Sequence, residues 1–129
     1  MQLPKIINTA ELIEQINQSE LYLDLIKQLN KDFNLAGVSV KFYNDETPRI
    51  VFDQLKEIIL ELLQKKFDDF LHILYRIDVN EIQIKKIIED MSGDIEEQIS
   101  FIILKRVWQK VWYKKYYTNL SSQSINFTE

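Results

Sequence analysis

Cysteine is absent from this 129-residue sequence, and histidine occurs once. Without cysteine the chain has no disulfide, no thiolate ligand for a metal ion and no thiol nucleophile. With a single imidazole, few arrangements remain in which a base activates a serine or threonine. These absences exclude disulfide-stabilised, zinc-thiolate and cysteine-dependent classes of protein, and we expect no cofactor.

Glycine and proline are scarce as well, with two residues of each. All-β domains use both residues freely in turns, so their scarcity favours helices. It also leaves no glycine-rich turn of the kind that binds phosphate at the start of a helix. Hydrophobic residues make up 46% and charged residues 28% of the chain, which is typical of a folded globular domain.

Long apolar runs are missing too. No run approaches the roughly 20 residues that span a bilayer, and the start of the chain has no apolar core of signal-peptide length. We therefore expect a cytoplasmic protein without a membrane span.

The first predicted helix begins near residue 9. Asn8 and Glu11 have the spacing of a capping box, and apolar residues follow at helical intervals to about residue 34. The polar run 17–20 interrupts this pattern, and Ser19 is a suitable cap for a second helix. The sequence therefore leaves open whether residues 9–34 form one helix or two.

Residues 38–43 alternate between apolar and polar side chains, as a short extended segment does. A single strand cannot satisfy its own backbone hydrogen bonds. The segment is either a covering loop or a strand that pairs with another copy of the chain, and we favour the loop.

Thr47 followed by Pro48 is a strong helix start, because proline at the first helical position loses no hydrogen bond. The apolar stripe that follows predicts one helix to about Arg76. Its members are Phe52, Leu55, Ile59, Leu62, Leu63, Phe67, Phe70 and Leu74.

Two more helices complete the prediction. Asp78 and Glu81 have the spacing of a capping box for a helix that ends near Gly93. Asp94 is the expected cap of the last helix, which runs to about Tyr117 and is apolar on nearly every side in its first half. A helix of that composition belongs in the middle of a core.

The fold class predicted by these patterns is all-α, a compact bundle of four or five amphipathic helices. Residues 1–118 form the single domain. Residues 119–129 show no hydrophobic period and are predicted to be a flexible C-terminal tail.

Charge is unevenly distributed along the chain. Residues 1–97 carry 11 positive and 19 negative side chains, a net charge of −8, whereas residues 98–128 carry five positive side chains and no negative one. An acidic body thus precedes a basic C-terminal segment, and such asymmetry bears on the choice of partners.

The segment 105–117 is the compositional outlier, because it interleaves these five cations with both tryptophans and three tyrosines. It contains the candidate partner surface, which comprises Lys105, Arg106, Trp108, Lys110, Trp112, Lys114, Lys115 and Tyr116.

Trp108, Trp112 and Tyr116 recur every four residues and form a stripe. The stripe is either packed in the core with the cations reaching outward, which we favour, or exposed to a protein partner or a second copy. Nucleic acid is a less favoured partner because the acidic body repels it, and a membrane surface is less favoured still.

His72 follows Asp69 by three positions, which is half of the spacing found in di-iron helical bundles. That site needs the motif twice and two further glutamates, so we predict a solvated His72 paired with Asp68. Adjacent carboxylates such as Asp68 with Asp69, or Glu96 with Glu97, diverge by about 100° on a helix and cannot converge on one substrate atom.

Two segments, 74–81 (LYRIDVNE) and 103–111 (ILKRVWQKV), resemble segments of small helical proteins of Bacteroidetes bacteria. The resemblance implies a bacterial, cytoplasmic origin and brings no activity, cofactor or site residue with it.

The function is not determined by any motif in the sequence. We expect a non-catalytic interaction or structural module that self-associates or binds a protein through the C-terminal helix. The alternative is a nucleic-acid-binding or regulatory helical protein that uses the basic segment 105–115, and an enzyme is the least favoured class.

Overall fold

The structure, a computed structural model, describes residues 3–128 of the chain and the side chains of residues 3–117. Its six helices are α1 (Thr9–Gln18), α2 (Tyr22–Leu35), α3 (Pro48–Lys65), α4 (Phe67–Ile77), α5 (Glu81–Asp90) and α6 (Ile95–Thr128). Helices cover 75% of the chain, and no strand occurs within residues 3–128. The predicted all-α class is confirmed, whereas the predicted number of four or five helices is too low.

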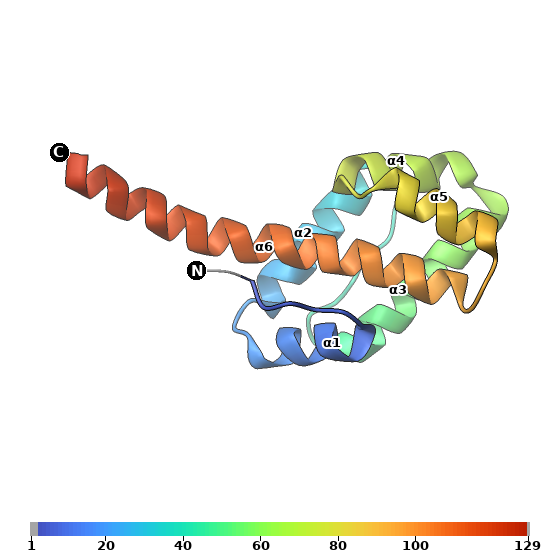
Figure 1. Ribbon diagram of the computed structural model, residues 1–129, viewed down its shortest axis with the longest axis horizontal. Coiled ribbons are helices and arrows are strands. Elements are labelled where there is room, and N and C mark those ends of the chain that lie inside the picture. The colour runs from blue at the N-terminus through green and yellow to red at the C-terminus, as the bar shows by residue number, and fades with distance from the viewer. Residues whose placement is uncertain (1–2, 129) are drawn as a thin grey trace.

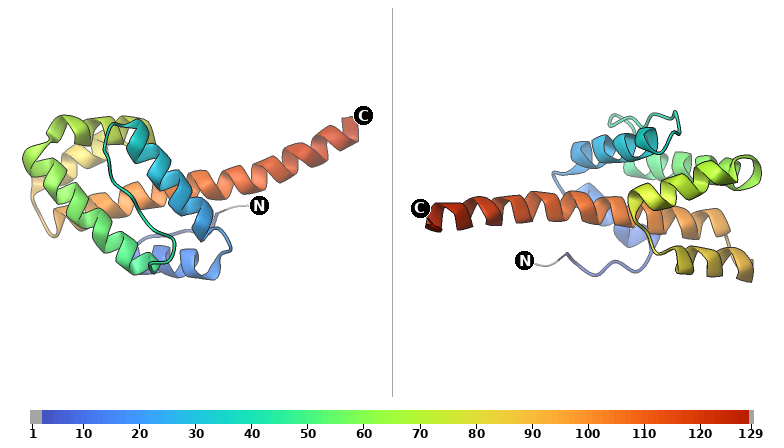
Figure 2. Two further views of the ribbon diagram at one scale, coloured as in Figure 1. Left: turned by 180° about the vertical axis from the view of Figure 1, so that it is seen from behind. Right: turned by 90° about the horizontal axis from the view of Figure 1, so that it is seen from above.

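Helix α6 is the axis of the molecule. It contacts each of the other five helices, and Figure 1 shows them gathered around its first half while its second half extends beyond the body. The two further views in Figure 2 show the same extension. The prediction that the apolar start of this helix lies in the middle of the core agrees with these contacts.

Large side chains from four helices meet in that core. Phe33 of α2, Phe52 of α3, Phe70 of α4 and Trp108 of α6 are each at most 1% exposed. Burial of one such side chain contributes roughly 1.5–3 kcal/mol. The packing of the bundle on α6 is therefore the main stabilising contribution that the structure shows.

Residues 9–34 form two helices rather than one. Asn8 caps α1 as predicted, since its Oδ1 accepts a hydrogen bond of 2.8 Å from the backbone N–H of Glu11. The Ser19 hydroxyl donates to the carbonyl of Ile16 at 2.7 Å and accepts from the N–H of Leu21 at 3.2 Å. Ser19 therefore ends α1, and no side chain caps the start of α2.

The single helix predicted from Pro48 to Arg76 is wrong, because the helix breaks at Lys66. This residue has φ −141° and ψ 61°, outside the helical region, and both closes α3 and opens α4. The break allows α4 to contact α2, α3 and α6, whereas a straight helix of this length would extend about 45 Å. Phe67, predicted on the apolar face, is 45% exposed beside the break.

The turn into α5 also differs from the prediction. Asp78 adopts a left-handed conformation with φ 66° and ends α4, so it is not the cap of the next helix. Asn80 has that role, because its Oδ1 accepts from the N–H of Gln83 at 3.2 Å. At the next turn the prediction is confirmed, since Asp94 accepts from the N–H of Glu97 at 2.9 Å and caps α6.

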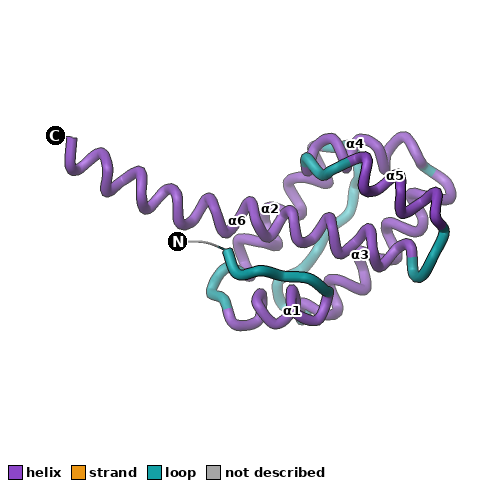
Figure 3. Tube along the Cα trace, viewed as in Figure 1, coloured by secondary structure: helices purple, strands orange, loops and turns teal. Residues whose placement is uncertain are grey.

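The segment 38–43 belongs to the long loop between α2 and α3, which crosses the bundle in Figure 3. Two side chains of the segment, those of Val38 and Phe42, are buried. The Asn30 side chain holds the loop to α2, because its Nδ2 donates to the carbonyl of Phe42 at 2.9 Å and its Oδ1 accepts from the N–H of Phe42 at 2.7 Å. The favoured prediction of a covering loop is confirmed.

The last helix is longer than predicted. It continues to Thr128, where the sequence pattern predicts an end near Tyr117. The backbone of most of the predicted tail 119–129 is thus helical, while Glu129 lies outside the described residues. The flexibility of that segment in solution stays a prediction.

Candidate functional site

The aromatic stripe of the predicted partner surface lies largely within the protein. Trp108 is 1% and Trp112 is 8% exposed, so the favoured prediction of core packing holds for both. The alternative prediction, in which Trp108 and Trp112 belong to an exposed partner surface, is wrong for this structure, because both side chains are buried. Tyr116 is half-buried, with its ring centroid 4.4 Å from that of Trp112.

Two of the predicted surface cations hold other segments of the chain. Lys105 Nζ donates to the carbonyl of Ile6 at 2.7 Å and fastens the N-terminal segment to α6. Arg106 Nε donates to the carbonyl of Asp78 at 3.1 Å, and its guanidinium lies 3.5 Å from the Asp78 carboxylate. Both cations thus have an intramolecular role that the sequence pattern does not reveal.

A third cation, Lys110, contacts a buried carboxylate. Asp32 of α2 is fully buried, and its oxygens accept from Arg76 Nε at 3.2 Å, Lys110 Nζ at 3.3 Å and Gln28 Nε2 at 3.0 Å. A buried charge is tolerated when it is paired and hydrogen-bonded in this way. Asp32 therefore joins α2, α4 and α6, a role that the sequence analysis missed.

The remaining two cations of the predicted surface, Lys114 and Lys115, are exposed and face α2. With Lys27 and Lys31 of α2 they line a groove of about 450 Å³, which we call the lysine groove. Lys27 and Lys31 are four residues apart and therefore share one side of α2. Lys114 and Lys115 are adjacent on α6, so their side chains leave that helix about 100° apart, and both line the groove. The other lining residues are Asp24, Gln28 and Val111.

None of these four lysines forms an ion pair with a carboxylate among the described side chains. Asp24 is the one acidic residue in the lining of the groove. A concave surface lined by charges of one sign raises the local concentration of counter-ions. Four lysines and one aspartate give the described lining of this groove a net charge of +3, in a chain of net charge −4.

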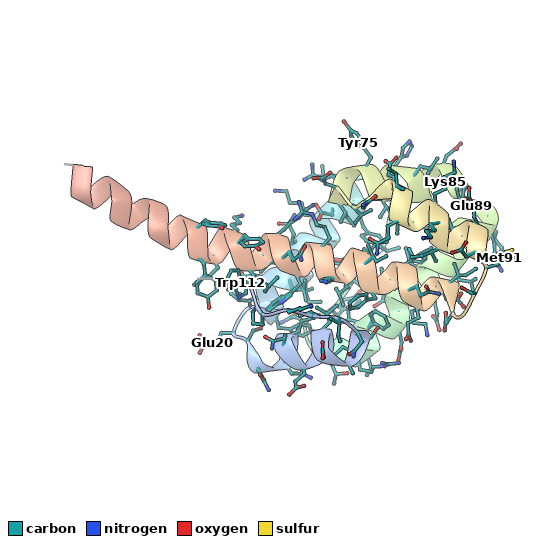
Figure 4. The ribbon with its side chains drawn as sticks, in the orientation of Figure 1. Glu20, Tyr75, Lys85, Glu89, Met91 and Trp112 are labelled. Carbon is teal, nitrogen blue, oxygen red and sulfur yellow. The ribbon has the colours of Figure 1, made fainter. Side chains whose placement is uncertain are left out.

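A second hollow, which we call the aromatic cavity, adjoins the lysine groove. It has a volume of about 600 Å³, and Asp24 and Lys115 line both spaces. Its wall includes Trp108, Trp112 and Tyr116, and its polar lining comes from α1 and the turn after it. Figure 4 shows Trp112 and Glu20 at this end of the body, where α6 leaves the bundle.

One hydrogen-bond donor of Trp108, a residue that lines the aromatic cavity, is buried without an acceptor among the described groups. This donor is the indole Nε1–H. Buried donors of this kind are rare and call for an explanation. The helical pattern of the sequence does not reveal this buried donor.

The sole histidine takes no part in this site. His72 lies on the exposed side of α4, and its Nδ1 is 4.0 Å from Asp69 Oδ1, so the predicted pairing with Asp68 is corrected to Asp69. Among the described residues no three acidic, histidine or cysteine side chains gather as metal ligands would. Glu97 of the adjacent pair Glu96 and Glu97 contacts Lys56 at 3.4 Å.

No family model matches the chain, and neither a curated protein nor a solved structure matches it. The resemblance noted in segments 74–81 and 103–111 stays an expectation. Within the described residues, no helix combines the length and apolarity that crossing a membrane requires.

Proposed function

We propose that this protein is a non-catalytic binding module that associates with a second copy of itself through the C-terminal part of α6. The observation that carries the proposal is the extension of α6 beyond the other five helices (Figure 1). We call residues 117–128 the projecting segment.

The composition of the projecting segment indicates that its helix needs a partner. It is rich in serine, threonine and asparagine, which are weak helix formers. The segment continues a helix that the body nucleates, but extension through weak helix formers adds little stability per residue. Packing against another surface supplies the stability that its own sequence does not.

The absence of charge in the projecting segment favours a second copy of the same segment as its partner. Residues 116–128 contain no charged side chain, so two projecting segments meet without like-charge repulsion. A nucleic acid or an anionic membrane, by contrast, attracts cations, which this segment lacks.

The nucleic-acid alternative has weaker support for a second reason. Three of the five cations in segment 105–115 are engaged within the chain, through Lys105, Arg106 and Lys110. The cytoplasmic location and the bacterial origin remain part of the proposal.

Sedimentation equilibrium tests the proposal on the full chain and two matched variants. Tyr117 is 54% exposed at the start of the projecting segment, and Tyr75 is 83% exposed on α4. We expect Tyr117→Asp to weaken dimerisation at least about tenfold by placing a charge in the contact, and Tyr75→Asp to leave it unchanged. A full chain that remains monomeric, or equal effects of both variants, would contradict the proposal.

A further inference from the structure

The lysine groove brings together four positive side chains that form no ion pair among the described residues. Lys27 and Lys31 stand at i,i+4 on α2, a spacing at which like charges repel, and Lys114 and Lys115 add two more cations from α6. The cations of α6 that serve the fold have partners, as Lys110 has in Asp32. Departures from favourable local electrostatics concentrate at functional sites, so the groove has the character of an anion site.

The number and type of donors favour phosphate groups as the bound anion. Each ammonium offers three hydrogen-bond donors and a compact charge, and lysine is a regular phosphate ligand. Four ammonium groups match a chain of two or three phosphates better than a single carboxylate. The groove's volume of about 450 Å³ is within the range of small-molecule sites.

The aromatic cavity provides space for a planar group next to those phosphates. Tyr116 is half-buried in its wall beside Trp112, and aromatic rings stack on nucleobases. The polar lining from Gln15 and Gln18 offers amide groups to a base edge.

Asp24 lies where the two spaces adjoin, since it lines both. A carboxylate at that position opposes binding of a bare polyphosphate. It suits a ligand that places hydroxyl groups there, because carboxylates accept hydrogen bonds from ribose hydroxyls in nucleotide sites. The order lysines, carboxylate, aromatic rings thus parallels the order phosphates, ribose, base.

From this juxtaposition we infer that the lysine groove and the aromatic cavity together bind a nucleoside diphosphate or triphosphate. The lysines hold the phosphates, Asp24 accepts from the ribose, and the base lies against Tyr116. The site uses residues of α2 together with Lys114, Lys115 and Tyr116 of α6, which precede the projecting segment. Nucleotide binding can therefore be tested separately from self-association through that segment.

Isothermal titration calorimetry of the full chain tests the inference, with ATP, GTP, CTP and UTP as probes. In Lys27→Glu/Lys31→Glu we expect the affinity to fall at least about tenfold, because two of the four cations are reversed. The matched control is Lys85→Glu/Lys86→Glu on α5, which makes the same charge change on exposed residues. Lys85 lies at the other end of the body from Trp112 (Figure 4), and binding to this control should stay within about twofold of the unaltered chain.

Two further titrations separate a nucleotide from other polyanions. Asp24→Asn should weaken nucleotide binding but strengthen binding of inorganic tripolyphosphate, because it removes both the ribose acceptor and a repelling charge. A single-stranded oligonucleotide should bind more weakly than the preferred nucleotide, since the acidic body repels a long polyanion.

The inference is overturned by any of four results. The first is that none of the four nucleotides binds, and the second is that both lysine double variants lose nucleotide affinity equally. The third is that tripolyphosphate binds as tightly as the preferred nucleotide, and the fourth is that the oligonucleotide binds more tightly than that nucleotide. Sedimentation equilibrium of the same lysine variants separates failure of this inference from failure of the proposed self-association. Neither lysine pair lies in the projecting segment, so both variants should dimerise like the unaltered chain whether or not nucleotides bind.

Discussion

From Ile95 to Trp112, α6 packs among five helices, whereas from Tyr117 onward it extends beyond them (Figure 1). The first half carries the buried residues Ile99, Ile103, Leu104, Val107 and Trp108. The second half is uncharged and rich in weak helix formers. Both parts belong to one continuous helix, so the difference lies in composition and in contact with the other helices.

The comparison shows that one continuous helix can form the centre of the core in one part and extend beyond it in another. The embedded half nucleates the helix through tertiary packing, and each further residue then adds one hydrogen bond at little cost. The projecting segment therefore extends from a helix that is already formed. The cations lie between these extremes: Lys105, Arg106 and Lys110 are engaged within the body, whereas Lys114 and Lys115, just before the projecting segment, line the lysine groove.

The largest effect is expected in the embedded half. Trp108→Ala removes the largest fully buried side chain and should lower the free energy of unfolding by about 3–5 kcal/mol. Urea denaturation followed by circular dichroism measures this loss. A change below about 1 kcal/mol would show that Trp108 does not pack in the core.

The next effect tests the charge network beneath α6. Arg76→Ala/Lys110→Ala leaves the buried carboxylate of Asp32 without either cation. An uncompensated buried charge is strongly destabilising, so we expect a loss of about 3 kcal/mol in urea denaturation. Adding Asp32→Leu should restore part of that stability, and failure of this rescue would contradict the role assigned to Asp32.

A smaller effect is expected at the start of α6. Asp94→Ala removes the cap and should cost about 1 kcal/mol. The hydrogen bond from the Glu97 backbone N–H, with Lys56 nearby, lowers the pKa of Asp94 below its usual value. Its contribution is therefore present above pH 3.8 and is lost as the pH falls through the lower, folded pKa.

Denaturation curves of the unaltered chain and of Asp94→Ala between pH 2 and pH 7 check that sign. The difference in stability between the two proteins should shrink toward the acid end. A difference that grows on acidification would contradict the assignment.

The smallest effect on folding is expected in the projecting half. Tyr117 is 54% exposed, so Tyr117→Ala should change the stability of the monomer by less than about 0.5 kcal/mol. Thermal unfolding at a concentration below the dimerisation range measures it. A loss comparable to that of Trp108→Ala would remove the distinction between the two halves.

The sequence predicted those parts of the fold that depend on local signals. The caps at Asn8, Thr47 and Asp94 were predicted and are present, because the capping side chain and its N–H lie three residues apart. The break at Lys66 was not predicted, since neither glycine nor proline marks it. It arises from the packing of α4 on other helices, which a local pattern does not contain.

The candidate site divides in the same way. The basic and aromatic composition of segment 105–117 pointed to α6, yet the partner lysines Lys27 and Lys31 lie more than eighty residues before Lys114 and Lys115 in the chain. The sequence contained one indication of the role of Asp32. This acidic residue stands three positions after Leu29, which is buried on the apolar face of α2. Pairing with Arg76 and Lys110 explains it only once the helices are assembled.

The two hydrogen bonds between Asn30 and Phe42 have a consequence for the behaviour of the protein at high concentration. An extended segment with a free N–H and C=O offers an edge to which strands of other molecules add, and this is a common route to amyloid-like aggregation. The Asn30 amide occupies both backbone groups of Phe42, as a neighbouring strand would. A single side chain thus blocks strand addition at the centre of the most β-prone stretch of the chain.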